Sequence, residues 1–317
     1  MFLLDTHCDT PGEILRGRNL TVDNSDIHVD FPKLVRGGVD AAFFALYVPA
    51  ALATEQAYEH AVRLYNAVKD TVEANPDKAA FAQSRDQAYA NKSKGLFSVF
   101  LGLENGSPIG TSLAGLHEFY DRGVRYMTLC HSADNEICDS CAGNGRWHGL
   151  SPFGREVIRE MNDMGMLIDV SHISDESFYD VLEISSRPVV ATHSCCRALA
   201  DHPRNMTDDM IRALADAGGV IQINFYPVFL DSSFKESEMF LSPRPSYKMI
   251  ADHIDHVVEL VGIEHVGIGS DFDGIEVTPE GMEDISMMPK LFEELSARGY
   301  KKSDLEKIAS ENFFNVF

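Results

Sequence analysis

The sequence predicts a closed α/β barrel of the (β/α)8 type. Eight short, nearly continuous apolar runs alternate along the chain with stretches of helical periodicity. Such runs are typical of parallel strands covered on both faces, and strands joined by helices form right-handed parallel crossovers. The 317 residues suit one barrel of about 250 residues with insertions. Since no linker, charge block or internal repeat interrupts the pattern, one barrel domain is expected over residues 1–317.

The expected strands are short and rich in Val, Ile, Leu and Phe. Each spans about four to eight residues, the usual length of a buried parallel strand. They are expected at 3–6, 41–48, 97–103, 124–130, 166–171, 189–192, 220–225 and 266–270.

Helices are expected between these strands. Residues 55–72 repeat an apolar side chain every three to four positions, which predicts a helix with one buried face. Three further helices should begin after the N-cap residues Ser151, Ser174 and Thr207. Their bounds are expected at 153–164, 175–184 and 208–217, and two more helices are expected at 247–261 and from about Ser303.

The charge balance excludes two classes of partner. The chain has 27 Lys and Arg against 49 Asp and Glu, a formal net charge of −22. Nucleic acids and anionic membranes both require clustered basic charge, so neither is expected as a partner. No apolar run approaches the roughly 20 residues of a membrane span, and MFLLDTHCDT lacks the basic start of a signal peptide. The six cysteines form no disulfide framework, which predicts a reducing, cytoplasmic setting. The role of the pair Cys138 and Cys141 stays open.

Metal-binding side chains follow six of the eight expected strands. Barrel active sites are built at the carboxyl ends of the strands, so these side chains should meet there. Two long connections, 130–150 and 227–245, should lie at the same end. The side chains concerned, in chain order, are His7, Asp9, Glu104, His131, Asp169, His172, His193 and Asp271.

Taken singly, each candidate has a simpler explanation. Glu104 could cap a helix, and His172 or His193 could be a core histidine with satisfied hydrogen bonds. Together, three imidazoles and two or three carboxylates suit zinc better than calcium or magnesium. The set contains more ligands than one tetrahedral ion can bind, so two ions that share a bridging carboxylate and a bridging hydroxide are expected. The histidines on expected helices should lie on the surface: His60, His117, His253 and His256.

These residues resemble the membrane (renal) dipeptidase family of binuclear zinc peptidases, within the amidohydrolase-type barrels. The resemblance runs in order from Asp5 to Phe317. The matching segments are DTHCDT, HVDFPKLVRGGV, GLENG, GVRYMTLCHS, GLSPFGREVIREMNDMGMLIDVSH, RPVVATHS, HPRNM, GGVIQINFYP, HVGIGSDFDG and ENFFNVF.

The resemblance implies zinc-dependent hydrolysis of dipeptides by a metal-bridging hydroxide. The substrates would be L-Xaa-Xaa dipeptides, with the choice between an L and a D residue at the C-terminal position left open, and the protein would form homodimers. The implied ligands are His7 and Asp9 for one zinc ion, His172 and His193 for the other, and Glu104 as the bridge.

The resemblance also implies the residues that handle the substrate. His131 would contact the substrate carbonyl, and Asp271 would bind substrate and transfer the proton. Arg204 would contact the substrate carboxylate, whereas the simpler alternative is an exposed arginine beside Asp208 and Asp209. The long connections match the family least, so the preferred dipeptide is left open.

Two other functions remain possible from the sequence. Other amidohydrolases, such as N-acyl-amino-acid or cyclic-amide hydrolases, often use a carboxylated lysine as the bridge. No strand end carries Lys here, and Glu104 fills that place. A non-catalytic, peptide-binding barrel would be expected to lack a ligand or Asp271, and neither is missing.

Overall fold

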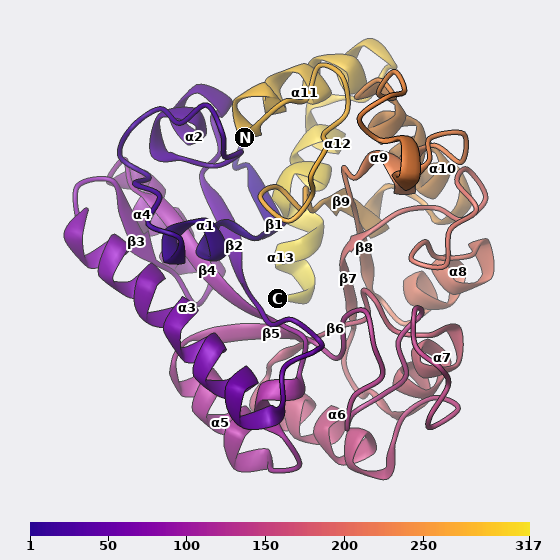
Figure 1. Cartoon of the computed structure of the whole chain (residues 1–317). Coiled ribbons are helices and arrows are strands. Elements are labelled where there is room, and N and C mark those ends of the chain that lie inside the picture. Colours follow the sequence, from indigo (N-terminus) through magenta and orange to yellow (C-terminus); the bar gives the residue numbers. More distant parts are fainter.

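A computed structural model describes residues 1–317, apart from the side chain of Glu238. Eight parallel strands form a nearly closed barrel with the order β1-β2-β4-β5-β6-β7-β8-β9, and the short β3 (Ala79–Phe81) pairs with β4 outside this path (Figure 1). The predicted fold class and all eight predicted strands are confirmed. The barrel strands are β1 (Leu4–Cys8), β2 (Ala41–Tyr47), β4 (Phe97–Glu104), β5 (Val124–Thr128), β6 (Leu167–Asp169), β7 (Val190–Ser194), β8 (Val220–Ile223) and β9 (Val266–Ile268).

The first strand meets the segment after the last strand at the carboxyl end. The Asp271 N–H donates to the His7 carbonyl at 3.0 Å, and the Asp9 N–H donates to the Phe272 carbonyl at 2.8 Å. The buried Asp5 carboxylate accepts the Ser270 N–H at 2.8 Å. These bonds fix His7, Asp9 and Asp271 relative to one another across the closure.

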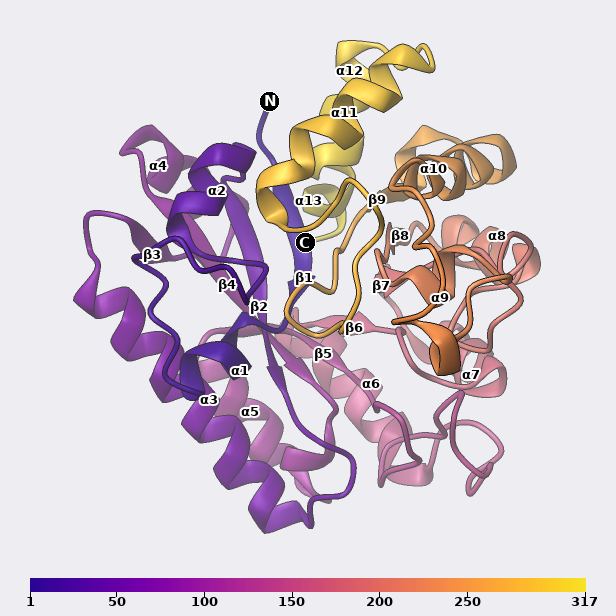
Figure 2. The same cartoon turned by 45° about the horizontal axis from the view of Figure 1, so that its top comes forward.

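Most of the helices surround the barrel, and the last one lies in the middle of the circle of strands (Figures 1 and 2). They are α1 (Thr10–Leu15), α2 (Phe31–Gly37), α3 (Thr54–Ala74), α4 (Arg85–Ser93), α5 (Leu113–Asp121), α6 (Pro152–Met164), α7 (Asp175–Ile184), α8 (Asp208–Asp216), α9 (Pro227–Leu230), α10 (Lys248–Val261), α11 (Met288–Ala297), α12 (Lys302–Glu306) and α13 (Asn312–Val316). Short 3-10 turns lie at Ser107–Ile109, Glu236–Glu238, Ile263–His265 and Ile285–Met287, and a π-helical turn, Lys307–Glu311, joins α12 to α13.

The predicted helix starts are confirmed by their caps. The side chains of Ser151, Ser174 and Thr207 each accept the backbone N–H three residues ahead, at α6, α7 and α8. The sequence analysis did not predict β3 or several helices, among them α4 and α5. These elements are short, and α4 buries only Ala88 and Asn91, so the apolar pattern there is weak.

An aromatic cluster closes the amino-terminal end of the barrel. Phe43, Phe100 and Tyr126 from β2, β4 and β5 share one buried cluster with Phe313 and Phe314 of α13. Figure 1 shows α13 and the C-terminus in the middle of the circle of strands. Because α13 fills this end, access to the barrel interior is from the carboxyl end of the strands.

Two expectations from composition concern membrane-spanning helices and disulfide bonds. Within the described part of the chain, no helix has both the length and the apolar character needed to cross a bilayer. All six cysteines are free, as predicted from the absence of a disulfide framework.

Candidate metal centre and active site

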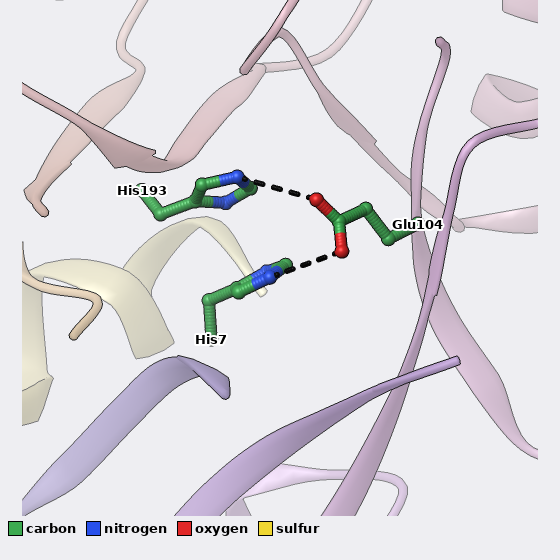
Figure 3. Close-up of side chains that lie close together, drawn as sticks. All are labelled: His7, Glu104 and His193. Atoms are coloured by element: carbon green, nitrogen blue, oxygen red, sulfur yellow. Dashed lines mark ion pairs between the residues drawn. The ribbon is translucent and has the colours of Figure 1, made fainter. Parts of the chain in front are cut away.

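The carboxylate of Glu104, the last residue of β4, faces two histidines from other strands (Figure 3). Its Oε2 is 3.4 Å from His7 Nε2, and its Oε1 is 3.6 Å from His193 Nε2. All three side chains are buried. The carboxylate therefore offers one oxygen to each side of the site, the arrangement expected of a bridge.

The other predicted ligands lie around this trio. Ligand atoms within 4.8 Å of one another form three groups, which are His7–Glu104–His193, Glu104–His131–His172 and His7–Asp9–Asp271. All five predicted metal ligands are thus brought together. His131, predicted as a catalytic residue that contacts the substrate and not among the five ligands, lies near enough to Glu104 and His172 to be a ligand as well.

Three site residues lie in turns beyond their strands. His131, His172 and Asp271 each follow the last residue of β5, β6 or β9 by three positions. His172 and Asp271 adopt positive φ angles of 73° and 64°, which are uncommon for residues other than glycine. Unfavourable backbone conformations of this kind concentrate at functional sites, where the surrounding structure holds them.

The site has the features of a cation-binding site. His7 Nε2 and Asp9 Oδ1 are buried and have no hydrogen-bond partner among the described residues. His7 Nε2 faces carboxylate oxygens of Asp9 at 3.5 Å and Asp271 at 3.9 Å, in addition to Glu104. Burial and the nearby Glu104 raise the pKa of Asp9 to about 6. A divalent cation would neutralise this crowded negative charge, and the nitrogen and oxygen donors fit zinc.

Tyr126 positions the ring of His7 from inside the barrel. Its hydroxyl lies 2.8 Å from His7 Nδ1, leaving Nε2 to face the site. The tyrosine ring lies directly against Gly102 of β4, where an added Cβ would come within 2.2 Å of it. The sequence analysis missed this pair, although the glycine two residues before Glu104 was a signal for close packing.

Asp271 has a pKa suited to proton transfer. Burial raises the pKa of its carboxyl group to about 7, although the Asn224 amide donates to Oδ2 at 2.8 Å and favours the charged form. Gly274 lies close to Asp271 and Asp9, and a Cβ there would come within 2.1 Å of Asp9 Oδ2. The Asp-Gly pair at 273–274 therefore permits the approach of the two carboxylates.

His131 stays neutral near physiological pH. Burial, followed by the charge of Arg204, lowers its pKa to about 3. The His131 ring contacts Tyr47 edge-on, with 4.8 Å between ring centroids. A neutral imidazole can donate one N–H to a substrate oxygen.

Arg204 is buried, which excludes the alternative of an exposed arginine. Only 9% of the residue is exposed. Its Nη2 donates to the His193 carbonyl at 3.0 Å and its Nη1 to the Ser194 hydroxyl at 3.4 Å. The guanidinium lies 5.3 Å from the centre of the Phe229 ring. Asp208 and Asp209 pair instead with His256 and Arg212.

One cavity of about 770 Å³ is lined by six of the site residues, which are Asp9, Glu104, His131, His172, Arg204 and Asp271. Both long connections contribute to it, as predicted, through residues such as Cys141, Ala142 and Phe229. The sequence analysis missed the wall formed by β2 and α3. That wall includes Tyr47, Pro49, His60 and Leu64.

The predictions for two helical histidines need correction. His60 was expected on the surface but is half-buried and lines this cavity. His253 was also expected on the surface, and this was wrong, because it is fully buried in α10. Its Nδ1 accepts the Cys196 N–H at 3.0 Å, and its Nε2 lies 3.1 Å from the Leu230 carbonyl.

Comparisons of the sequence find relatives that are named as dipeptidases. A family model described as membrane dipeptidase (peptidase family M19) matches residues 1–317. A protein named as an uncharacterised dipeptidase from Schizosaccharomyces pombe is 31% identical, over 99% of this chain and 80% of its own length. A dipeptidase from Clonostachys rogersoniana is 32% identical, over 99% of this chain and 83% of its own length.

Solved structures show the same similarity. The crystal structure of an M19 dipeptidase superposes with a TM-score of 0.92 at 26% identity, covering 100% of this chain and 97% of that one. A metallopeptidase from Rhodobacter sphaeroides, solved with a phosphinate mimic of the dipeptide L-Ala-D-Ala, gives a TM-score of 0.91 at 25% identity, covering 100% and 98%.

Proposed function

Because the chain belongs to the membrane dipeptidase family, and is therefore a dipeptidase, we propose that it hydrolyses dipeptides with two zinc ions at the carboxyl end of the barrel. The single catalytic domain would span residues 1–317. The observation that carries the proposal is Glu104, whose two carboxylate oxygens face His7 and His193 separately. One bridging carboxylate with imidazoles on both sides is a donor set for two ions.

The proposed ligands divide between the two sides of Glu104. His7 and Asp9 would hold one ion on the side of Glu104 Oε2, and His172 and His193 would hold the other on the side of Oε1. Zinc bound there would lower the pKa of water toward neutrality and polarise the peptide carbonyl. The pairing is supported by the 2.9 Å separation of the Nε2 atoms of His172 and His193.

Three residues of the chain handle the substrate. Asp271 accepts the proton of the attacking water and passes it to the leaving amine, because a pKa near 7 suits both transfers. His131 donates its N–H toward the carbonyl oxygen as negative charge develops there. Arg204 binds the substrate's free carboxylate through the N–H groups not used by its two contacts in the protein.

The positions of Arg204 and Tyr47 around the barrel support one direction for the bound dipeptide. Arg204 follows β7 and Tyr47 ends β2, with three strands between them in either direction around the barrel. A dipeptide held by its carboxylate at Arg204 would extend toward the wall of Tyr47, Pro49 and Leu64. The N-terminal side chain would contact this largely apolar wall.

The D configuration at the C-terminal position is part of the proposal. The relative from Rhodobacter sphaeroides was solved with a mimic of L-Ala-D-Ala. We infer that this chain cleaves L-D as well as L-L dipeptides. Cytoplasmic location is supported by the cysteine content, and a homodimer by the family resemblance.

The test combines metal analysis with a dipeptide panel. Purified protein is analysed for bound metal and assayed with matched dipeptides carrying L or D C-terminal residues, before and after chelation. The proposal predicts two zinc ions per chain and hydrolysis that chelation abolishes and zinc restores. Full hydrolysis by chelated protein would contradict the role of the metal, and no hydrolysis of any dipeptide by zinc-loaded protein would contradict the substrate class.

A further inference from the structure

We propose that Asp169 and Thr192 form a buried relay that fixes the tautomer and direction of the His193 ring. The inference rests on the metal centre proposed above and deepens it, because it concerns how one ligand is prepared. Asp169 ends β6, and Thr192 directly precedes His193 in β7. The sequence grouped Asp169 with the side chains able to bind metal, but it is not among the proposed ligands, and Thr192 has had no role so far.

The relay consists of two short hydrogen bonds. The Thr192 hydroxyl lies 2.7 Å from Asp169 Oδ2 and 2.8 Å from His193 Nδ1. All three residues have zero exposure to solvent. No water can therefore substitute for either partner.

The direction of each bond follows from the donors around Asp169. Its Oδ1 accepts the N–H groups of Ser171 at 3.0 Å and Thr192 at 2.9 Å. Its Oδ2 accepts the hydroxyls of Thr128 at 2.6 Å and Thr192. A carboxylate with four donors has only lone pairs to offer, so the single proton of the Thr192 hydroxyl points to Asp169.

The remaining contact of the Thr192 hydroxyl must then be as an acceptor. His193 supplies the proton from Nδ1, and a neutral imidazole with hydrogen on Nδ1 carries its lone pair on Nε2. Nε2 is the atom that faces Glu104. His193 is thus set in the tautomer that can bind a cation at Nε2.

Near the carboxyl ends of β6 and β7, hydrogen bonds to side chains replace the backbone hydrogen bonds between the two strands. The register of β6 and β7 pairs Asp169 with Val190 alone. Three residues further along β7, the His193 N–H donates to the Ser171 hydroxyl at 3.2 Å. Asp169 and Ser171 therefore hold the end of β7 in place of a continued strand pairing.

His7 has no such relay on the other side of Glu104. The Tyr126 hydroxyl contacts His7 Nδ1, and among the described residues no second hydrogen bond is found for it. That hydroxyl can donate or accept, so it does not select a tautomer. The two histidines differ, because the relay presets the tautomer of His193 and the Tyr126 contact leaves that of His7 open.

The experiment measures zinc binding to metal-free protein by competition with a chromophoric chelator. Thr192→Val keeps the shape and removes the hydroxyl, and should weaken one of the two binding steps about 10- to 100-fold, the usual effect of losing such a partner. Asp169→Asn presents an amide N–H to the Thr192 hydroxyl and reverses the relay, so it should weaken the same step.

Two variants serve as controls. Thr192→Ser keeps the hydroxyl and should restore zinc affinity to near the wild-type value. Thr128 also donates its hydroxyl to Asp169 Oδ2, but this hydroxyl contacts no histidine. Thr128→Val should therefore leave both zinc-binding steps nearly unchanged. Thermal unfolding of each metal-free variant reports whether the barrel is intact.

The outcomes separate this inference from the proposed function. If wild-type protein binds no zinc, the metal centre itself is wrong. If wild-type protein binds two ions and Thr192→Val binds both as tightly, or Thr192→Ser binds as weakly as Thr192→Val, the relay is overturned. Imidazole ¹⁵N NMR of metal-free wild-type protein tests the tautomer without any variant. Hydrogen on His193 Nδ1 supports the relay, and hydrogen on Nε2 overturns it.

Discussion

Arg204 should make the enzyme select free dipeptides over their C-terminal amides. The residue is nine-tenths buried and held by His193 and Ser194, so its guanidinium is fixed in the cavity. A substrate amide in place of the carboxylate would leave this charge without its counterion. Losing a charge-assisted pair in a desolvated site costs roughly 2–5 kcal/mol, or roughly 30- to 4000-fold in kcat/KM.

The assay compares kcat/KM for one dipeptide and for its C-terminal amide in three proteins. Wild type should prefer the dipeptide by a factor in the stated range. Arg204→Met should lose most activity on the dipeptide and little on the amide, so the preference collapses. Arg212→Met is the matched control, because Arg212 pairs with Asp209 outside the cavity and should leave the preference intact. Equal kcat/KM for the dipeptide and the amide in wild type would refute the carboxylate-binding role.

Two further predictions concern proton transfer and pH. Asp271→Asn keeps the side-chain shape but cannot accept a proton, so kcat should fall on the order of 10²–10⁴-fold. Zinc content, measured by elemental analysis, should stay constant. Turnover near the wild-type rate would show that another residue is the base. Burial lowers the pKa of His253 to about 4, below the roughly 6.5 of an unfolded chain, so the unfolded state binds more protons as pH falls from about 7 to 4. This residue alone should lower the free energy of unfolding by about 3 kcal/mol over that interval. Denaturant titrations of metal-free wild-type and His253→Gln proteins measure the effect, and the variant should lack this part of the pH dependence. Identical pH profiles for the two proteins would contradict the burial argument.

The strands were predictable from sequence because parallel strands covered on both faces leave a simple apolar signature. Polar residues at the carboxyl ends of these strands, such as His7 and Glu104, stand out against the apolar runs. They were therefore predictable as site residues. The turn conformations of His172 and Asp271 were not, since nothing in their neighbours requires a positive φ. The sequence placed these residues near the site, and the fold determines which way they point.

Other features depend on contacts between distant segments. His253 lies on a helix with a clear apolar face, but its burial depends on backbone partners at Cys196 and Leu230 from other parts of the chain. The wall containing Tyr47 and Leu64 was missed because an apolar residue on a strand or helix is normally assigned to the core. Only the position of α3 at the mouth of the barrel brings Leu64 to the cavity.

The most direct test of the two-ion centre is dipeptide hydrolysis measured against added zinc. Metal-free protein is titrated with zinc, and both bound metal and initial rate are recorded at each step. With Glu104 bridging two ions, activity should rise chiefly with the second equivalent and level off at two per chain, and His172→Ala should lose metal and activity together. Full activity at one equivalent, or a fully loaded and active His172→Ala protein, would contradict the account.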